Sequence, residues 1–114
     1  MTRRVPDRGD IVHLNFDPAR GREQQGKRYG LVLTLAAFNR FGLAMIAPIT
    51  HGGGFAREHG FAVPLMGAGT SVQGVVLCNQ VRMVDFRERE ARVMEALPKE
   101  WLDDVLAHVR TLLD

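Results

Sequence analysis

The sequence predicts a small antiparallel β-barrel closed by a C-terminal helix, and three observations favour this class. Short apolar stretches with strand periodicity recur along residues 10–97. Glycine and proline residues that favour turns separate these stretches. The apolar period becomes helical only at the end of the chain, over residues 98–113. A bent sheet of short strands with one packed helix fits this order of elements.

The first half of the chain predicts two strands and one helical turn. Residues 10–16 place Val12, Leu14 and Phe16 on one face, which is typical of a half-buried strand. A loop is expected over residues 17–27. Residues 29–35 are apolar at nearly every position, which predicts a strand buried on both faces. Residues 36–41 are expected to form one helical turn.

The second half predicts more short strands between glycine-rich loops. Residues 44–49 are expected to form a third strand that Pro48 and Thr50 bring to an end. A long loop is expected over 51–60, a short extended segment over 61–65 and a turn over 67–69. Residues 74–83 contain a β-branched run and are expected to form the most buried strand. Residues 92–97 add a last strand.

The closing helix is predicted from a single apolar face. Pro98 suits the first helical position, where a missing N–H costs nothing, and Asp103, Asp104 and Arg110 mostly fall on the solvent side. We expect this helix to pack over one opening of the barrel. The apolar face consists of Trp101, Leu102, Val105, Leu106, Val109, Leu112 and Leu113.

Length, composition and cysteine content indicate one globular domain, residues 1–114, in a reducing compartment. The chain is 46% apolar and 25% charged, which is ordinary for a globular protein. No apolar run approaches the roughly 20 residues that span a bilayer, and no signal peptide follows the basic N-terminus. Because Cys78 is the single cysteine, it cannot form an internal disulfide. We therefore expect a cytoplasmic protein without a membrane partner.

The basic residues are compatible with nucleic acid as a partner. Of the 15 basic residues, 13 are arginine, and the sequence pI is about 9.2. The planar guanidinium fork suits phosphate oxygens. Arginine-rich codon usage explains the same bias equally well, so the composition leaves both interpretations open.

Several motifs are incomplete. Gly21 to Lys27 matches most of a phosphate-binding P-loop, but position 28 is arginine, which provides no hydroxyl for magnesium, and a strand rather than a helix is expected next. The four histidines and Cys78 lack the spacing of zinc ligands. Nothing resembles a Ser-His-Asp or Cys-His arrangement. We expect no metal and no cofactor.

Three stretches in order, at matching separations, resemble the MazF/PemK/ChpB family of bacterial toxins, and most of all its ChpB and PemK branch. They are RGDIVHLNFDPARGREQQGKR (residues 8–28), LAAFNRFGLAMIAPITHGGGFAREHGFAVPL (35–65) and GVVLCNQVRMVD (74–85). The resemblance implies a small SH3-like barrel with a C-terminal helix that forms homodimers. It also implies metal-free cleavage of single-stranded mRNA at short preferred sequences, and inhibition by a cognate antitoxin.

The resemblance also implies the catalytic residues. The family's essential arginine falls on Arg28, its essential threonine on Thr50 and its acidic residue on Glu23. In RNA cleavage by the 2′-hydroxyl group, Arg28 suits stabilisation of the phosphate charge and Thr50 suits hydrogen bonding to the same oxygens. Glu23 is the available carboxylate for a general base. Without the resemblance, a loop arginine, its salt-bridge partner and a turn-forming threonine would explain the same residues.

Further residues of these stretches are predicted to bind RNA. Gln80 matches the glutamine of the third stretch. Phe55 offers a surface for base stacking, and Arg57 a cation for a phosphate, although a flexible solvent loop is an equally good interpretation of this segment. The full predicted set is Arg22, Gln24, Gln25, Lys27, His51, Phe55, Arg57, Asn79 and Gln80.

The sequence departs from the family pattern in ways that leave the general acid and base open. Tyr29 stands where family members commonly have proline. The histidine, arginine and aspartate of PemK-type sites are replaced by Arg22, Leu77 and Asn79, and ChpB-like members share the leucine and the asparagine. Two alternatives remain, a toxin of similar fold that binds DNA gyrase and a catalytically inactive RNA- or peptide-binding barrel. The chain lacks the C-terminal Trp-Gly-Ile-like tail of the gyrase-binding class.

Overall fold

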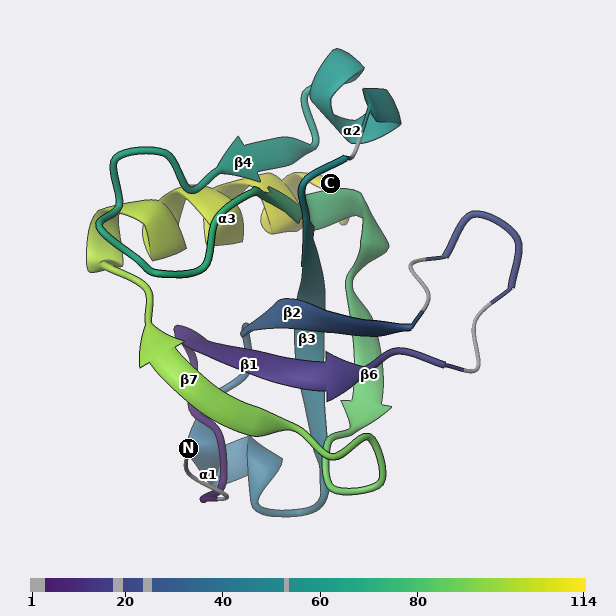
Figure 1. The fold of residues 1–114 in the computed structure, drawn as a ribbon, viewed down its shortest axis with the longest axis vertical. Coiled ribbons are helices and arrows are strands. Elements are labelled where there is room, and N and C mark those ends of the chain that lie inside the picture. The colour runs from purple at the N-terminus through teal and green to yellow at the C-terminus, as the bar shows by residue number, and fades with distance from the viewer. Residues whose placement is uncertain (1–3, 18–19, 24–25, 53) are drawn as a thin grey trace.

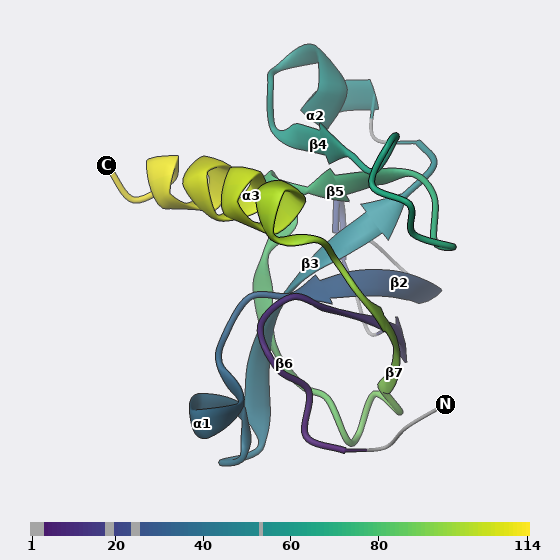
Figure 2. The same cartoon turned by 90° about the vertical axis from the view of Figure 1, so that its left-hand side faces the viewer.

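The computed structural model describes residues 4–17, 20–23, 26–52 and 54–114. Its core is one strongly bent sheet, with α1 and α2 at opposite ends of the molecule and α3 beside β4 (Figure 1; Figure 2). The strands are β1 (Asp10–Asn15), β2 (Lys27–Val32), β3 (Leu43–Thr50), β4 (Ala62–Pro64), β5 (Val75–Leu77), β6 (Arg82–Asp85) and β7 (Arg92–Ala96). The helices are α1 (Ala36–Asn39), α2 (Gly54–Glu58), the 3₁₀ helix η1 (Cys78–Gln80) and α3 (Lys99–Thr111).

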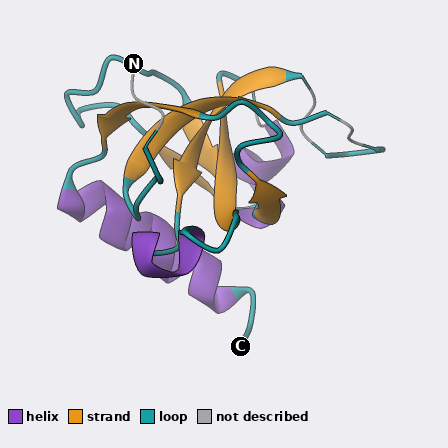
Figure 3. Cartoon of the chain, turned by 90° about the horizontal axis from the view of Figure 1, so that it is seen from below, coloured by secondary structure: helices purple, strands orange, loops and turns teal. Residues whose placement is uncertain are grey.

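The seven described strands are antiparallel and follow the order β4-β5-β3-β2-β1-β7, while β6 pairs with the first half of β3. The sheet therefore curls around the long strand β3, which contacts β2 along one edge and both β5 and β6 along the other. This arrangement confirms the predicted class of a mainly β barrel with a C-terminal helix. Figure 3 shows the curved sheet with α3 along one side.

The central strands bury both faces because alternate side chains enter two separate cores. In β1, Ile11 packs toward α3, whereas Val12 and Leu14 pack into the bend of the sheet. The prediction of a half-buried first strand is therefore wrong at Ile11, which is fully buried. The prediction for the second strand is confirmed over residues 30–33, which are buried on both faces, and is wrong at Leu35, which lies beyond β2 and is about half exposed.

The helix α3 covers one core with most of its predicted face. Val105 is fully buried, and Trp101, Leu102, Leu106 and Val109 pack against the same cluster. Leu112 and Leu113 do not join it, because α3 ends at Thr111 and both side chains are exposed. Pro98 takes the N-cap position rather than the first helical position. Among the described residues, no helix is long and apolar enough to cross a membrane.

Two sequence predictions about strand ends are wrong, because both ends depend on which strand pairs with each part of β3. Pro48 lies inside β3 instead of ending it, at the point where the outer neighbour of β3 changes from β6 to β5. A residue without an N–H group is tolerated in such a gap. Residues 74–83 are not one strand, because β5 and β6 pair with different parts of β3 and η1 joins them. The predicted burial of this segment is confirmed for Val75 to Cys78.

Cys78 provides a pH-dependent contribution to stability. Its thiol is fully buried, and burial, with a smaller effect of the Asp104 charge, raises the thiol pKa from 9.0 to about 12. The folded state thus retains a proton that the unfolded state loses, so this contribution is complete below pH 9 and is lost between pH 9 and 12. We expect the free energy of unfolding, measured in urea, to fall across this range by up to about 1.4 kcal/mol per pH unit from this group. A Cys78→Ala variant with an equally steep fall would contradict the assignment.

Candidate functional site

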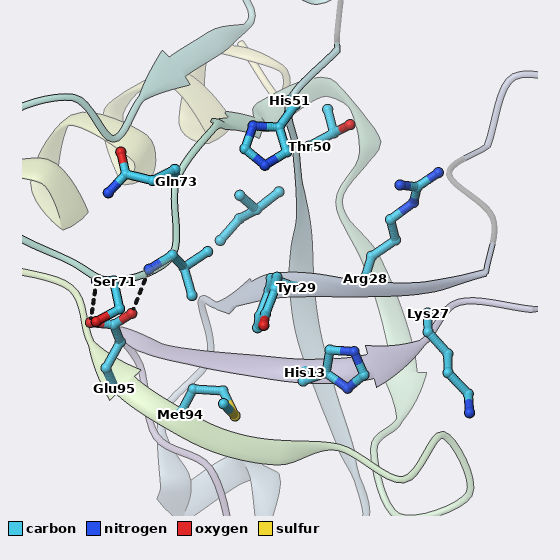
Figure 4. Close-up of a pocket in the computed structure, with 12 residues that line it drawn as sticks. His13, Lys27, Arg28, Tyr29, Thr50, His51, Ser71, Gln73, Met94 and Glu95 are labelled. Carbon is cyan, nitrogen blue, oxygen red and sulfur yellow. Dashed lines mark hydrogen bonds between the residues drawn. The ribbon is translucent and has the colours of Figure 1, made fainter.

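Arg28 lies near the start of β2, and Thr50 is the last residue of β3. Tyr29 pairs with Ile49 in the register of these strands, so Arg28 and Thr50 occupy the next facing positions. Both line a pocket of about 560 Å³, together with the predicted RNA-binding residues Lys27 and His51. Figure 4 shows the Arg28 guanidinium group and the Thr50 hydroxyl group on the same side of this pocket. A permanent cation beside a hydroxyl group is suited to a phosphate.

A tight turn after β3 orients the Thr50 side chain. The backbone N–H of Gly52 donates a hydrogen bond to Thr50 Oγ1 at 3.2 Å. Because the oxygen accepts this bond, the hydroxyl proton is directed elsewhere and is available as a donor to an anionic oxygen. The hydroxyl group is thus held in a geometry that suits the predicted role of Thr50.

Arg57, which lies in α2, holds this turn in place by hydrogen bonds to its backbone. Its Nε donates to the Gly52 carbonyl oxygen at 2.9 Å, and its Nη2 donates to the His51 carbonyl oxygen at 3.3 Å. The guanidinium fork matches the two successive carbonyl groups, which a single ammonium group cannot do. The structure therefore gives Arg57 a contact with the backbone of the turn, and the contact with RNA phosphate that the sequence suggests stays a prediction.

We expect Arg57→Ala to lower the kcat of RNA cleavage about tenfold with little change in KM, since the turn that orients Thr50 loses both hydrogen bonds. Arg57→Lys should recover only part of the rate because it retains the charge but not the fork. Steady-state cleavage of a short RNA by each variant measures both constants. A rise in KM with a weaker salt dependence of binding would instead indicate a phosphate contact.

The pocket also contains residues that the sequence analysis missed. Figure 4 shows His13 and Met94 along one rim, with Ser71, Gln73 and Glu95 toward the far side. The strand order places β1 between β2 and β7, which brings residues from both ends of the chain to the pocket that contains Arg28. One signal was available for His13, because the alternation in β1 places it on the polar face. The contributions of β7 and of the loop over 71–73 had no local signal.

Glu23 lies at a different pocket from Arg28 and Thr50. This second pocket, of about 730 Å³, is lined by Arg22, Glu23, Phe55, Asn79, Gln80, Val81 and Arg82. The carboxylate of Glu23 accepts a hydrogen bond from the Arg20 backbone N–H at 2.6 Å, which closes a turn in the exposed loop. The predicted site is thus divided into an arginine–threonine pocket, which contains Lys27 and His51, and a second pocket, which contains four of the nine predicted RNA-binding residues. The role of Glu23 as a base stays a prediction.

The second pocket offers groups that suit a nucleobase. Phe55 is about half exposed, and its ring lies 4.4 Å from that of His59, centroid to centroid. Asn79 Oδ1 is buried and accepts no hydrogen bond within the described chain. Leu77, which replaces the arginine of PemK-type sites, is buried in a small apolar cluster and presents no group to a phosphate.

Two of the predicted residues, Gln24 and Gln25, lie outside the described residues. Within residues 4–17, 20–23, 26–52 and 54–114, no three His, Cys, Asp or Glu side chains are grouped so that they could hold a metal ion.

A small barrel that presents an arginine and a threonine hydroxyl group in one pocket defines a protein equipped to bind a phosphodiester. Comparison with known families matches residues 7–113 to the PemK-like, MazF-like toxins of type II toxin-antitoxin systems. The chain is 47% identical over 109 residues to the endoribonuclease toxin ChpB of Escherichia coli K12, covering 95% of this chain and 94% of ChpB. It is 43% identical over 116 residues to the Escherichia coli endoribonuclease PemK, covering 99% and 87% of the two chains.

Solved structures agree with these relatives. The crystal structure of MazF from Deinococcus radiodurans superposes with a TM-score of 0.87 at 39% identity, covering 96% of this chain and 97% of that chain. A MazE-MazF complex from the same organism gives a TM-score of 0.81 at 37% identity, with the same coverage. The chain therefore belongs to the PemK-like, MazF-like family of type II toxins, and the resemblance to the ChpB and PemK branch is supported.

Proposed function

We propose that this protein is the toxin of a type II toxin-antitoxin system and acts as a metal-independent endoribonuclease on single-stranded mRNA in the cytoplasm. The observation that carries the proposal is the meeting of Arg28 and Thr50 in one pocket. The ChpB and PemK relatives, both endoribonucleases, support the activity. Single strands are required because in-line attack needs a rotated backbone that a regular duplex does not provide.

The chemistry proceeds within the RNA chain. The 2′-oxygen attacks the adjacent phosphorus, the bond from phosphorus to the 5′-oxygen breaks, and the products are a 2′,3′-cyclic phosphate and a 5′-hydroxyl group. Arg28 stabilises the negative charge that builds up on the phosphate oxygens, and it retains its proton throughout. The Thr50 hydroxyl group donates a hydrogen bond to the same oxygens.

Two proton transfers complete the reaction, one from the 2′-hydroxyl group and one to the 5′-oxygen. Glu23 is the family's acidic residue, although it lies at the second pocket. His51 lies beside Thr50, and within the described chain its ring makes no hydrogen bond, ion pair or ring contact. An imidazole can accept a proton or donate one, so His51 suits either transfer. The titratable and charged groups that share its pocket are His13, Lys27, Arg28, Tyr29 and Glu95.

A comparison of Glu23→Gln with His51→Gln distinguishes these two groups. The variant that lacks a proton-transfer group is expected to lose about 10²-fold in kcat together with one limb of the pH–rate profile. The other variant should keep the shape of the profile. Single-turnover cleavage of a defined RNA between pH 5 and 9 provides this measurement. Retention of both limbs by both variants would show that neither residue transfers a proton.

The partners follow from the same proposal. We expect a homodimer and a complex with a cognate antitoxin, and the superposition with a MazE-MazF complex supports the antitoxin. Exposed apolar side chains on and beside α1, and where β3 pairs with β6, offer surface for such contacts. These side chains are Leu35, Phe38, Phe41, Leu43 and Met83. Sedimentation should give twice the chain mass of 12.7 kDa, and a mass of one chain would contradict the dimer.

The deciding experiment is cleavage of a long single-stranded RNA by the purified, antitoxin-free protein in EDTA. We expect discrete cuts whose upstream fragments end in a cyclic phosphate, and mapping of these ends gives the preferred sequence. A folded protein that binds RNA without cutting it would support the inactive barrel instead. A folded protein that neither cuts nor binds RNA would overturn the proposal. Binding to DNA gyrase would then be measured.

A further inference from the structure

The pocket that contains Arg28 and Thr50 has an apolar lining beyond the reacting groups. Ile49 and Val72 are each more than 90% buried and contribute to the wall, and Met94 closes the pocket from β7. A charged phosphate group is not stabilised by contact with such an apolar surface. A pocket that combines an apolar wall with fixed polar groups is typical of a site for a ring-shaped organic group.

Two aromatic rings stand on one side of this pocket. His13 and Tyr29 face each other across β1 and β2, with ring centroids 5.2 Å apart in an edge-to-face arrangement. Tyr29 is partly buried and packs against the core below the sheet, so its ring is supported from behind. Aromatic side chains held in this way are the usual platform for unstacked bases of single-stranded RNA.

The opposite side of the pocket is fixed and polar. The Glu95 carboxylate accepts hydrogen bonds from the backbone N–H groups of Ser71 and Val72 at 3.0 and 2.8 Å, which ties the loop over 71–73 to β7. Gln73 Nε2 donates to the Thr70 carbonyl oxygen at 2.8 Å. Within the described chain, the Gln73 side-chain oxygen and the Ser71 hydroxyl group make no hydrogen bond and remain available to the edge of a base.

We propose that this pocket binds the nucleobase of a nucleotide that flanks the scissile phosphate, with Tyr29 as the principal stacking residue and Gln73 and Ser71 at the base edge. The inference rests on the proposed function. Arg28 and Tyr29 line the same pocket, so a base on Tyr29 and a phosphate on Arg28 belong to neighbouring parts of one RNA strand. Lys27 and Arg28 provide the positive charge that the backbone requires at the mouth of the pocket.

Tyr29 can be observed alone, because it is the single tyrosine of the chain. Protein labelled with 3-fluorotyrosine therefore gives one ¹⁹F resonance from this site. The ligand is an RNA around the mapped cut, made resistant by a 2′-deoxy substitution at the attacking nucleotide. We expect binding to shift the resonance through the ring current of the stacked base. An abasic substitution at one nucleotide flanking the cut should abolish the shift, and an abasic substitution four nucleotides away should not.

Affinity provides a second measurement. Tyr29→Leu should weaken binding of the resistant RNA about tenfold, as loss of one stacked base predicts, whereas Tyr29→Phe should bind nearly as well as the wild type. Met66→Leu is a control, since Met66 is 83% exposed and does not line the pocket. Thermal unfolding of each variant reports on the fold.

The outcomes separate this inference from the proposed function. If the RNA binds, by fluorescence anisotropy, while the Tyr29 resonance stays in place or shifts equally with every abasic RNA, the nucleobase pocket is wrong and the nuclease stands. If only an antitoxin peptide shifts the resonance, the pocket belongs to that partner and the inference is likewise overturned. If the wild type fails to cut or bind any RNA, the proposed function fails, and the inference fails with it.

Discussion

Arg28→Ala is expected to reduce the rate of RNA cleavage by about 10²–10³-fold, the usual cost of removing one group that stabilises charge in a transition state. The reason is geometric, because Arg28 faces Thr50 across β2 and β3 and both residues line the same pocket. Arg28 is also exposed, so the substitution should leave the free energy of unfolding nearly unchanged. Single-turnover cleavage in EDTA, beside urea unfolding of the same samples, measures both quantities.

Lys27→Ala is the matched control for this prediction. Lys27 is exposed, precedes Arg28 in β2 and lines the same pocket, yet its position is not opposite Thr50. Its loss should weaken RNA binding in a salt-dependent way and leave kcat within a few-fold of the wild type. Arg28→Lys should recover little activity, since a point charge does not reproduce the bidentate fork. Equal losses in Lys27→Ala and Arg28→Ala would show that the pocket needs only positive charge.

Local periodicity was enough to predict the central strands and α3. Each of these elements carries its pattern within one stretch of chain, such as Val12, Leu14 and Phe16 in the first strand. The break between β5 and β6 could not be predicted, because it depends on which part of β3 each segment meets. The position of Pro48 within β3 depends on the same long-range pairing. The five-residue helix α2 formed inside an expected glycine-rich loop, where it brings Arg57 to the turn after β3.

The residues of the candidate site could likewise be predicted only in part. Arg28 and Thr50 were predicted from the family resemblance, and the register of β2 and β3 explains why residues 22 positions apart lie together. His13, Met94 and Glu95 were not predicted, since they reach the pocket only through the pairing of β1 with both β2 and β7. The sequence placed Glu23 and Arg28 in one loop and one site, whereas the structure places them at different pockets.

Gly74→Ala is expected to cause the largest loss of stability near the site. Gly74 has a φ of +120°, which L side chains rarely adopt, and a Cβ atom would lie 2.5 Å from the Thr50 carbonyl oxygen. Backbone strain and the forced contact should together reduce the free energy of unfolding by about 2–5 kcal/mol. Since Thr50 must move to relieve the contact, cleavage per folded molecule should fall as well, by about tenfold or more.

Gly42→Ala separates the two causes. Gly42 has a nearly equal φ of +115°, but a Cβ atom there would meet no atom within 4 Å. It should therefore suffer the conformational penalty alone, about 1–3 kcal/mol, and keep full activity per folded molecule. Urea unfolding gives the first quantity for each variant, and cleavage at a temperature where both variants are folded gives the second. If Gly74→Ala also kept full activity per folded molecule, the turn that follows β3 would tolerate displacement, and orientation of the Thr50 hydroxyl group would not limit the reaction.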